Sequence, residues 1–301
     1  MTEPFIPVPP SGEVAGLRVF IHSPHGGNPV PLVADARHMD DEQMRSVAQR
    51  YGHESAFLLP ASDARADWRL RFFVPRHEME MCGHATVGAL WGLRQWGIWT
   101  QPTAVVETLS GLVQVEWDGA SGRAWVSQPA PTVRHLQDHE RTCVARALGW
   151  RESRMPPLVV NSCTSRTKTL VNVGSVEELQ MLRPDCQLVE AACKAIDSTG
   201  LYPYAVDDRA ADGVVFARQF PRSSGYPEDA ATGIAAAALW GFLHQSGRIA
   251  VGRADAPAAA FLVRQGDAMG KPSAIEIRPR RSEDGRVVGC WLSGRVAFAA
   301  L

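Results

Sequence analysis

Two alanine-rich segments, one in each half of the chain, share a sequence pattern. Residues 85–93 read ATVGALWGL and residues 231–243 read ATGIAAAALWGFL, so both start with Ala-Thr and contain Ala-Leu-Trp-Gly near the end. Thr86 and Thr232 lie 146 positions apart, which is close to half of the 301 residues. A repeat of this period favours duplicated halves over two unrelated alanine-rich core helices.

Both segments are apolar around nearly the whole helical circumference, and each is followed by a glycine, Gly97 or Gly247. A helix that is apolar on every face must be buried on every face. Strand-like patterns dominate the flanking sequence, at residues 16–23, 68–74, 112–117 and 124–128. Residues 118–122 are expected to form a hairpin loop between the last two strands. Asp40 is expected to cap a helix that stops at Gly52. We therefore predict an α+β fold of two pseudo-symmetric domains, each a rolled, mainly antiparallel sheet around a central buried helix.

The boundary between the halves is expected near residues 126–135, because the pattern restarts after the segment QPAP at residues 128–131. We predict an N-terminal half over residues 17–130 with its central helix at 84–97. The C-terminal half covers residues 131–301 with its helix at 232–247, and its last strand could instead pack back on the first half. Residues 1–16 contain two glutamates and four prolines. They are interpreted as a flexible arm, because a signal peptide needs a basic start and an apolar stretch.

Composition excludes several classes of function. The net charge is −1 and the basic residues are scattered, which argues against a nucleic-acid partner. No apolar run approaches the roughly 20 residues of a membrane helix. Six cysteines lie far apart with no CxxC pair, so we expect reduced thiols and a cytoplasmic protein. Residues 77–84 contain two histidines, a cysteine and acidic side chains, but their spacing matches no familiar zinc site, and no metal is expected.

A polar cluster precedes each predicted central helix. Residues 80–84 read EMCGH in the first half, and Glu228–Asp229 stand ahead of the second helix. A helix N-terminus offers unpaired N–H groups and the positive end of the helix dipole. Two such ends facing one cleft would hold a small anion, typically a substrate carboxylate.

Six segments, spread in order over nearly the whole chain, resemble one family. They are VFIHSPHGGNPVPLV (19–33), HESAFLL (53–59), CGHATVGA (82–89), SQPAP (127–131), GYPEDAATGIAA (225–236) and RQGDAMGKPSAIEI (264–277). Together they resemble the PhzF-like proteins, named for the isomerase of phenazine biosynthesis, within the diaminopimelate-epimerase-like fold. The resemblance implies two pseudo-symmetric domains, a homodimer, and no metal or organic cofactor.

The resemblance also implies site residues. The family's catalytic glutamate falls on Glu54, its cleft histidine on His84, and its second-half aspartate on Asp229. The positions implied for substrate binding are Cys82, Gly83, Thr232, Gly233 and Ile234, with Gly83 and Gly233 supplying backbone donors. From position alone, Glu54 could be a solvated carboxylate, Asp229 a helix cap and His84 a first-turn residue. The shared order and spacing favour the site.

The chemistry of these side chains agrees with such roles. A carboxylate in a closed, partly dry cleft can both take and return a proton, and Glu54 is the candidate. His84 can orient or protonate the substrate. Asp229 can pair with a substrate amine or hydroxyl, or steady the histidine.

Two positions depart from the patterns of this fold. Its epimerases and racemases use two opposed cysteines, which would fall on Cys82 and Ala230. One thiol and one methyl group cannot perform a symmetric two-base exchange, so epimerisation by that route is disfavoured. Cys82 is then either a thiol that lines the cleft or an inert core cysteine. Ile234 replaces a common serine, so the substrate cannot be carried over from the phenazine enzyme.

The function predicted from the sequence is a cofactor-independent isomerase that moves a proton on a small carboxylic or amino acid. One alternative is a dehydratase of a hydroxylated cyclic amino acid that uses Cys82, because elimination needs one base and one acid. The other alternative is a catalytically silent protein of the same fold that binds small acids.

Overall fold

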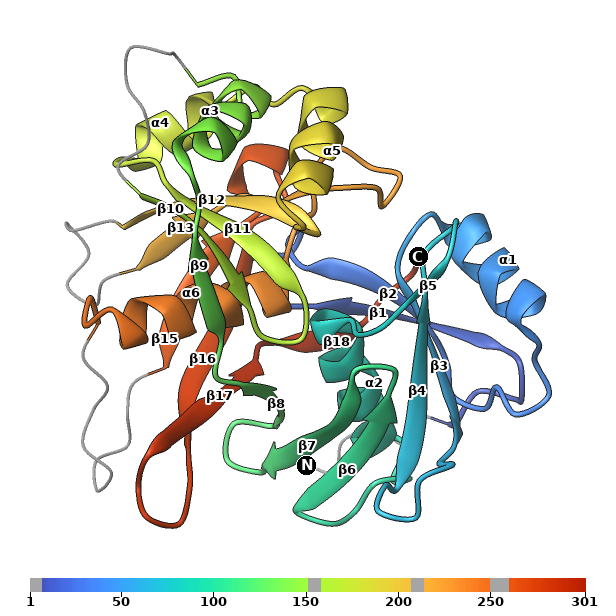
Figure 1. The fold of residues 1–301 in the computed structure, drawn as a ribbon. Coiled ribbons are helices and arrows are strands. Elements are labelled where there is room, and N and C mark those ends of the chain that lie inside the picture. The colour runs from blue at the N-terminus through green and yellow to red at the C-terminus, as the bar shows by residue number, and fades with distance from the viewer. Residues whose placement is uncertain (1–6, 151–157, 207–213, 250–259) are drawn as a thin grey trace. The chain divides into compact units, whose positions relative to one another are not determined.

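The computed structural model of the chain describes residues 7–150, 158–206, 214–249 and 260–301 (Figure 1). The chain divides into two compact units. Unit 1 comprises residues 1–21, 28–127 and 293–301, and unit 2 comprises residues 22–27 and 128–292. Each unit contains a mixed sheet and one central helix, and each is described by itself.

The sheet of unit 1 is mainly antiparallel. Its strands pair in the order β18–β1–β2–β3–β4–β6–β7–β8, and only the β2–β3 and β4–β6 pairs are parallel. The short strand β5 pairs antiparallel with β4. The strands are β1 (Val14–Val19), β2 (Asn28–Val33), β3 (Ser55–Pro60), β4 (Trp68–Phe73), β5 (Glu78–Met79), β6 (Thr103–Thr108), β7 (Gly111–Asp118), β8 (Arg123–Pro129) and β18 (Val296–Phe298).

The sheet of unit 2 repeats this scheme. Its strands pair in the order β9–β10–β11–β12–β13–β15–β16, with parallel pairs at β11–β12 and β13–β15. The series of strand pairs from β18 to β7 in unit 1 can be compared with the series from β9 to β16 in unit 2. Parallel and antiparallel pairs occur in the same order in both. The strands are β9 (Thr132–His135), β10 (Leu158–Cys163), β11 (Thr167–Asn172), β12 (Gly200–Val206), β13 (Val215–Ala217), β14 (Phe220–Pro221), β15 (Phe261–Gln265), β16 (Ser273–Arg281) and β17 (Val287–Ser293). The predicted pseudo-symmetry of the fold is confirmed.

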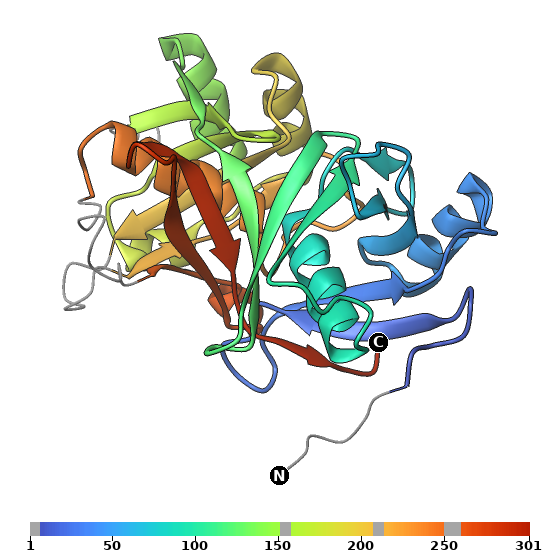
Figure 2. The same cartoon turned by 90° about the horizontal axis from the view of Figure 1, so that it is seen from below.

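The two predicted central helices are α2 (Gly83–Gln95) and α6 (Gly233–Gln245). Nearly every residue of α6 is buried, and α2 is buried on most of its circumference while Trp91 stays half-buried. Figure 2 shows α2 enclosed by strands of unit 1. An all-round apolar helix thus acts as the core around which each sheet rolls, as the sequence predicts.

The sequence repeat is partly out of register with these helices. Gly97 and Gly247, both in the left-handed conformation, follow the two helices at equivalent places, 150 positions apart. The two copies of the shared Ala-Leu-Trp-Gly motif are separated by the same number of positions to within one residue. The shared Ala-Thr does not match this separation, because Thr86 lies inside α2 whereas Thr232 is the N-cap of α6. The Ala-Thr match is therefore not a structural equivalence.

Among the described residues, four further α-helices cover the sheets. They are α1 (Asp41–Tyr51) in unit 1 and α3 (Asp138–Ala147), α4 (Val176–Met181) and α5 (Cys186–Ala195) in unit 2. The predicted start of α1 is confirmed, because the Asp40 carboxylate accepts the N–H of Gln43, whose side chain accepts the N–H of Asp40. The predicted stop at Gly52 is confirmed by its positive φ of 67°.

The start of the chain differs from the prediction. The first strand, expected over residues 16–23, runs from Val14 to Val19 and ends where Phe20 adopts a positive φ of 65°. It begins within the segment interpreted as an arm, whose residues 1–6 lie outside the described part. The predicted hairpin forms between β7 and β8, and the Asp118 carboxylate accepts N–H groups within its loop.

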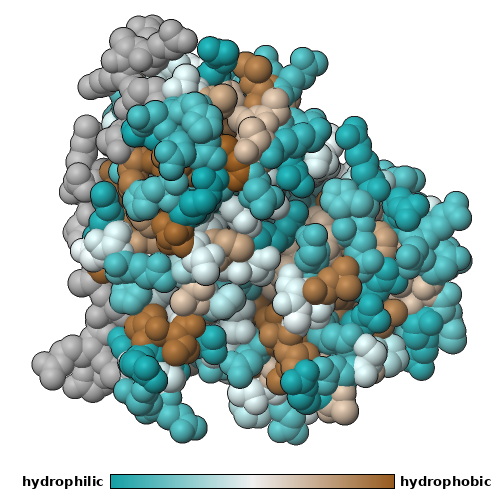
Figure 3. Space-filling view, viewed as in Figure 1, coloured by the Kyte–Doolittle hydropathy of each residue, from teal (hydrophilic) through white to brown (hydrophobic). Residues whose placement is uncertain are grey.

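The surface in the view of Figure 3 is mainly hydrophilic, with separate small apolar areas. In the part of the chain that the structure describes, no helix is long and apolar enough to cross a membrane.

Candidate active site

Glu54 lies in the short connection between α1 and β3. The left-handed Gly52 ends α1 and turns the chain toward the sheet, so that Ser55 is fully buried as the first residue of β3. The Glu54 side chain follows this turn inward, and the residue is only 6% exposed. A solvated carboxylate, the alternative left open by the sequence, does not describe this residue.

His84 lies at the second position of α2 and is 3% exposed. Its Nε2 atom is 3.9 Å from Oε2 of Glu54. The structure thus brings together two of the three predicted catalytic residues, from two segments of unit 1 that are 30 positions apart in the sequence.

Cys82 is the N-cap residue of α2 and is 3% exposed. Its Sγ atom lies 3.4 Å from Nδ1 of His84. The same sulfur lies 3.9 Å from Nε2, so the thiol is near both ring nitrogens, and the carboxylate of Glu54 is near Nε2 only. A neutral imidazole carries one donor and one acceptor nitrogen, so this ring can hold a proton on either side.

The N-termini of both central helices suit an anion. Within the described residues, neither N-cap side chain, Cys82 or Thr232, caps a backbone N–H of its own helix, and neither first turn contains an acidic residue. The first N–H groups of an α-helix have no partner inside the helix, and the helix dipole is positive at this end. Gly83 and Gly233 open the two helices, so their backbone lies at these ends.

The predicted residues of unit 2 lie around the start of α6. Asp229 is 6% exposed, and its N–H donates to the carbonyl of Gln219 at 3.0 Å. Its Oδ2 atom accepts a hydrogen bond of 2.5 Å from the hydroxyl of Thr232. Ile234, in the first turn of α6, is buried.

Residues 17–297 match the family model described as phenazine biosynthesis-like protein, PhzC-PhzF. The chain belongs to this family. An uncharacterized isomerase of Deinococcus radiodurans is 30% identical over 293 residues, covering 93% of this chain and 92% of that protein. The uncharacterized isomerase YfhB of Bacillus subtilis is 27% identical, covering 95% of this chain and 96% of that protein. This PhzF-family chain is accordingly an isomerase-type enzyme.

The solved structures agree with the predicted fold. The crystal structure of a Bacillus anthracis phenazine biosynthesis protein of the PhzF family superposes with a TM-score of 0.80 at 21% identity. The match covers 95% of this chain and 96% of that chain. The fold predicted from the sequence is therefore confirmed over nearly all of the PhzF-family chain.

Glu228, which the sequence places in a polar cluster with Asp229, has a different partner. Its carboxylate forms a bidentate ion pair with Arg218, at 2.9 Å to Nε and 2.7 Å to Nη2. Arg218 also donates from Nη1 to the carbonyl groups of Leu179 and Leu182, at the end of α4. The pair holds the segment before Asp229 in place. No local pattern in the sequence reveals it, because Arg218 stands ten positions before Glu228.

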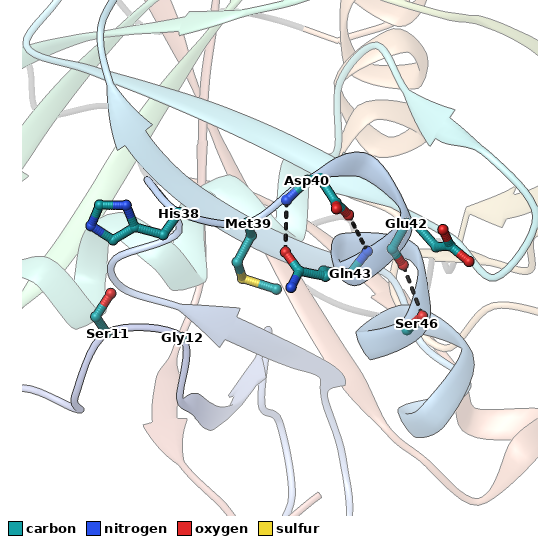
Figure 4. Close-up of a pocket in the computed structure, with 8 residues that line it drawn as sticks. All are labelled: Ser11, Gly12, His38, Met39, Asp40, Glu42, Gln43 and Ser46. Atoms are coloured by element: carbon teal, nitrogen blue, oxygen red, sulfur yellow. Dashed lines mark hydrogen bonds between the residues drawn. The ribbon is translucent and has the colours of Figure 1, made fainter.

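A polar groove of about 620 Å³ lies at the start of α1 and contains none of the predicted site residues (Figure 4). Its polar groups are largely engaged in the helix itself: Asp40 and Gln43 cap α1, and the Ser46 hydroxyl donates to the Glu42 carbonyl. Among residues 7–150, 158–206, 214–249 and 260–301, no three His, Cys, Asp or Glu side chains gather closely enough to hold a metal ion.

Proposed function

We propose that this chain moves a proton between two atoms of a small carboxylic or amino acid, without a cofactor, and that Glu54 carries the proton. The observation that supports this best is the buried Glu54 carboxylate, whose Oε2 atom lies 3.9 Å from Nε2 of His84. A base and a possible acid are thus available side by side within one unit.

The substrate carboxylate would bind at the N-terminus of α2, where Gly83 provides a backbone donor and Cys82 a polarisable wall. We also assign substrate contacts to Thr232, Gly233 and Ile234 at the start of α6. Asp229 would bind an amine or a hydroxyl group of the substrate. Ile234 adds an apolar contact, which favours a substrate with a hydrocarbon portion.

The reaction needs one C–H bond to break and one to form. The ionised Glu54 takes a proton from a carbon that is activated by the substrate carboxylate or by a neighbouring double bond. The electron pair shifts along the substrate, and helix N–H groups stabilise the charge that develops on the oxygen atoms. Glu54 then returns the proton to a different carbon while His84 orients or protonates the substrate, so that no net oxidation occurs. General acid–base work of this kind contributes about 10² to 10⁴ in rate.

The test is incubation of the protein in D₂O with a panel of small unsaturated acids and amino acids, followed by mass spectrometry. Turnover by proton transfer places deuterium on carbon without changing the rest of the formula. The Glu54→Gln variant serves as the matched control and should leave the substrate unlabelled. If wild-type protein and variant label the same acid equally, Glu54 is not the proton carrier.

A second candidate is the one-cysteine dehydratase. It is favoured by one observation, the 3.4 Å separation between Sγ of Cys82 and Nδ1 of His84, because a nearby imidazole can take the thiol proton. The two reactions differ in their products. A dehydratase releases a product lighter by one water, whereas the isomerase product keeps the substrate mass.

The resemblance to the family also supports a proposed homodimer. Light scattering coupled to size-exclusion chromatography should then give about twice the 32.8 kDa of one chain. A mass of one chain at micromolar concentration would contradict it.

A further inference from the structure

Gln265 occupies a central place in unit 2 that the sequence does not reveal. It is the last residue of β15 and is 1% exposed. Its Oε1 atom accepts hydrogen bonds from the Tyr202 hydroxyl at 3.0 Å and from the Thr232 N–H at 3.2 Å. Its Nε2 atom donates to the Asp229 carbonyl at 2.7 Å and to the Thr232 hydroxyl at 3.1 Å. A side-chain amide has two donors and about two acceptor sites, so the hydrogen-bonding capacity of Gln265 is fully used.

The backbone determines which way this amide faces. The Thr232 N–H can only donate and the Asp229 carbonyl can only accept, so the amide oxygen must face Thr232 and the amide nitrogen must face Asp229. Burial, and secondarily the charge of Asp229, raises the pKa of Tyr202 well above its usual value, so the phenol keeps its proton and donates.

This orientation sets the direction of the next hydrogen bond. Because Nε2 of Gln265 donates to the Thr232 hydroxyl, the hydroxyl proton is directed elsewhere, and it bonds to Oδ2 of Asp229 at 2.5 Å. A directed chain therefore runs from Gln265 through Thr232 to the carboxylate of Asp229. Its last member is one of the residues assigned to the substrate.

Gly266 explains how the end of β15 comes so close to the segment that carries Asp229. Its φ is +82°, and a Cβ atom there would lie 2.8 Å from the carbonyl oxygen of Ala230 and 2.3 Å from that of Lys271. Only glycine fits such a contact and such a φ without strain. The Gln-Gly pair of the segment RQGDAMG thus brings an amide against the Asp229 loop.

We propose that Gln265 is a positioning residue for the isomerase reaction: it directs the hydroxyl of Thr232 onto the carboxylate of Asp229 and so orients that carboxylate. The proposal rests on the proposed function through the role given to Asp229. Tyr202 supports the same arrangement from the other side of the amide.

The first experiment compares Thr232→Val with Thr232→Ser. Valine keeps the shape and the backbone N–H but removes the hydroxyl, whereas serine keeps the hydroxyl. We expect kcat/KM to fall by up to about 10²-fold in the valine variant, as for other small misplacements of a reacting group, and to recover in the serine variant. Equal activity of the valine variant and the wild type would overturn the proposal.

The second experiment is a double-mutant cycle between Gln265→Glu and Asp229→Asn. Glutamate can accept from Tyr202 and from the Thr232 N–H, but when ionised it cannot donate to the Thr232 hydroxyl. If Gln265 acts through Asp229, its substitution lowers kcat/KM in the wild-type background and has little further effect in the Asp229→Asn background. The same loss in both backgrounds would mean a role independent of Asp229 and would contradict the proposal.

Ser162→Ala is the matched control for stability. The Ser162 hydroxyl is buried and donates to the Ala238 carbonyl in the middle of α6. Its loss therefore weakens α6, the helix whose N-cap residue is Thr232, without changing the hydrogen bonds that lead to Asp229. We expect a lower unfolding midpoint with unchanged kcat/KM. A fall in kcat/KM equal to that of Thr232→Val would show that loosening of α6 alone explains the effect, against the proposal.

A crystal structure of Thr232→Val separates failure of this proposal from failure of the proposed function. A reoriented Asp229 carboxylate supports the positioning role even in an enzyme whose substrate is unknown, and an unmoved carboxylate overturns it. If Asp229→Asn retains full activity on a true substrate, the role of Asp229 in the proposed function fails, whatever the crystal structure of Thr232→Val shows.

Discussion

The Nε2 atom of His84 and the Oε2 atom of Glu54 lie 3.9 Å apart, and both side chains are almost fully buried. The separation is longer than the 2.7–3.2 Å typical of a direct N–H···O hydrogen bond. The two groups are thus near enough to share the work on one substrate, and neither is held tightly by this contact. His84 also lies in the first turn of α2, where the helix dipole favours negative charge nearby.

We expect Glu54→Gln to abolish turnover while the protein stays folded. The amide keeps the shape of the side chain but cannot accept a proton, and the loss of a general base typically costs about 10² to 10⁴ in rate. The measurement is kcat on any acid that the D₂O screen identifies, together with the circular dichroism spectrum.

Glu42→Gln is the matched control for this prediction. Glu42 is exposed, belongs to the same unit and lines the groove at the start of α1. Its substitution should leave kcat within about twofold, since surface changes away from a site have small effects. A comparable loss of kcat in both variants would mean that Glu54 is not the general base.

The central helices lead to a prediction on stability. Trp240 is 3% exposed in α6, whereas Trp91 in α2 is half-buried and packs against Phe298 with tilted rings whose centroids lie 5.1 Å apart. Trp240→Ala should lower the free energy of unfolding by about 3–5 kcal/mol, and Trp91→Ala by less. Guanidinium denaturation measures both. An unchanged midpoint for Trp240→Ala would contradict its place in the core.

The sequence predicts the fold well because the fold depends on local patterns. The all-round apolar segments, the Asp40 cap and the left-handed Gly52 are each readable within one turn of chain, and each is found in the structure. The first strand is shifted because the apolar pattern of GLRVFIHS continues past the point where Phe20 turns out of the sheet.

The site depends on contacts between distant residues, and there the sequence alone is weaker. The family resemblance points to Glu54 and His84, but only the structure shows that both are buried near one another. The partners of the Asp229 segment, Arg218 and Gln265, have no local signal. They act through hydrogen bonds to residues 10 and 36 positions away.

The Arg218–Glu228 pair predicts a coupled effect on stability. The two side chains are 9% and 12% exposed, so removal of one partner leaves an uncompensated buried charge. Arg218→Met or Glu228→Met should each lower the free energy of unfolding by about 3–5 kcal/mol, and the double variant should lose less than the sum. Urea denaturation of the three variants measures this. Strictly additive losses would mean that the pair is not coupled.

The buried thiol of Cys193 predicts a dependence of stability on pH. Burial raises its pKa from 9.0 to about 12, and the charges of Lys168 and Arg222 offset only part of this effect. The folded state therefore binds its proton more tightly than the unfolded state does. This contribution is fully present below pH 9 and is lost as the pH rises toward about 12, by about 1.4 kcal/mol per pH unit.

Cys193→Ala isolates that contribution from other groups that titrate in the same range. Denaturation at pH values of about 8 and about 10.5 should show a smaller loss of stability for the variant than for the wild type. Equal losses would mean that the thiol ionises as easily in the folded protein as in the unfolded chain.

Cys82 provides the prediction that separates the isomerase from the dehydratase. In the isomerase, Glu54 carries the proton and Ala230 leaves the thiol without an opposed partner, so Cys82→Ala should lower kcat only modestly. The loss would come from packing and from the thiol contact that steadies Nδ1 of His84 at 3.4 Å. In a dehydratase whose thiolate is the base, the same substitution should remove nearly all turnover, by at least about 10².

The rate of alkylation by iodoacetamide measures the reactivity of the Cys82 thiol and does not require a known substrate. Cys143 and Cys186 are exposed and would react first, so the experiment starts from a Cys143→Ser/Cys186→Ser background. A passive Cys82, which is 3% exposed, should then react slowly at neutral pH. A catalytic thiolate, paired with the imidazole at the N-terminus of α2, should react fast and be protected by a bound small acid. Fast alkylation combined with an inactive Cys82→Ala variant would place the dehydratase first, because only that reaction requires the thiolate itself.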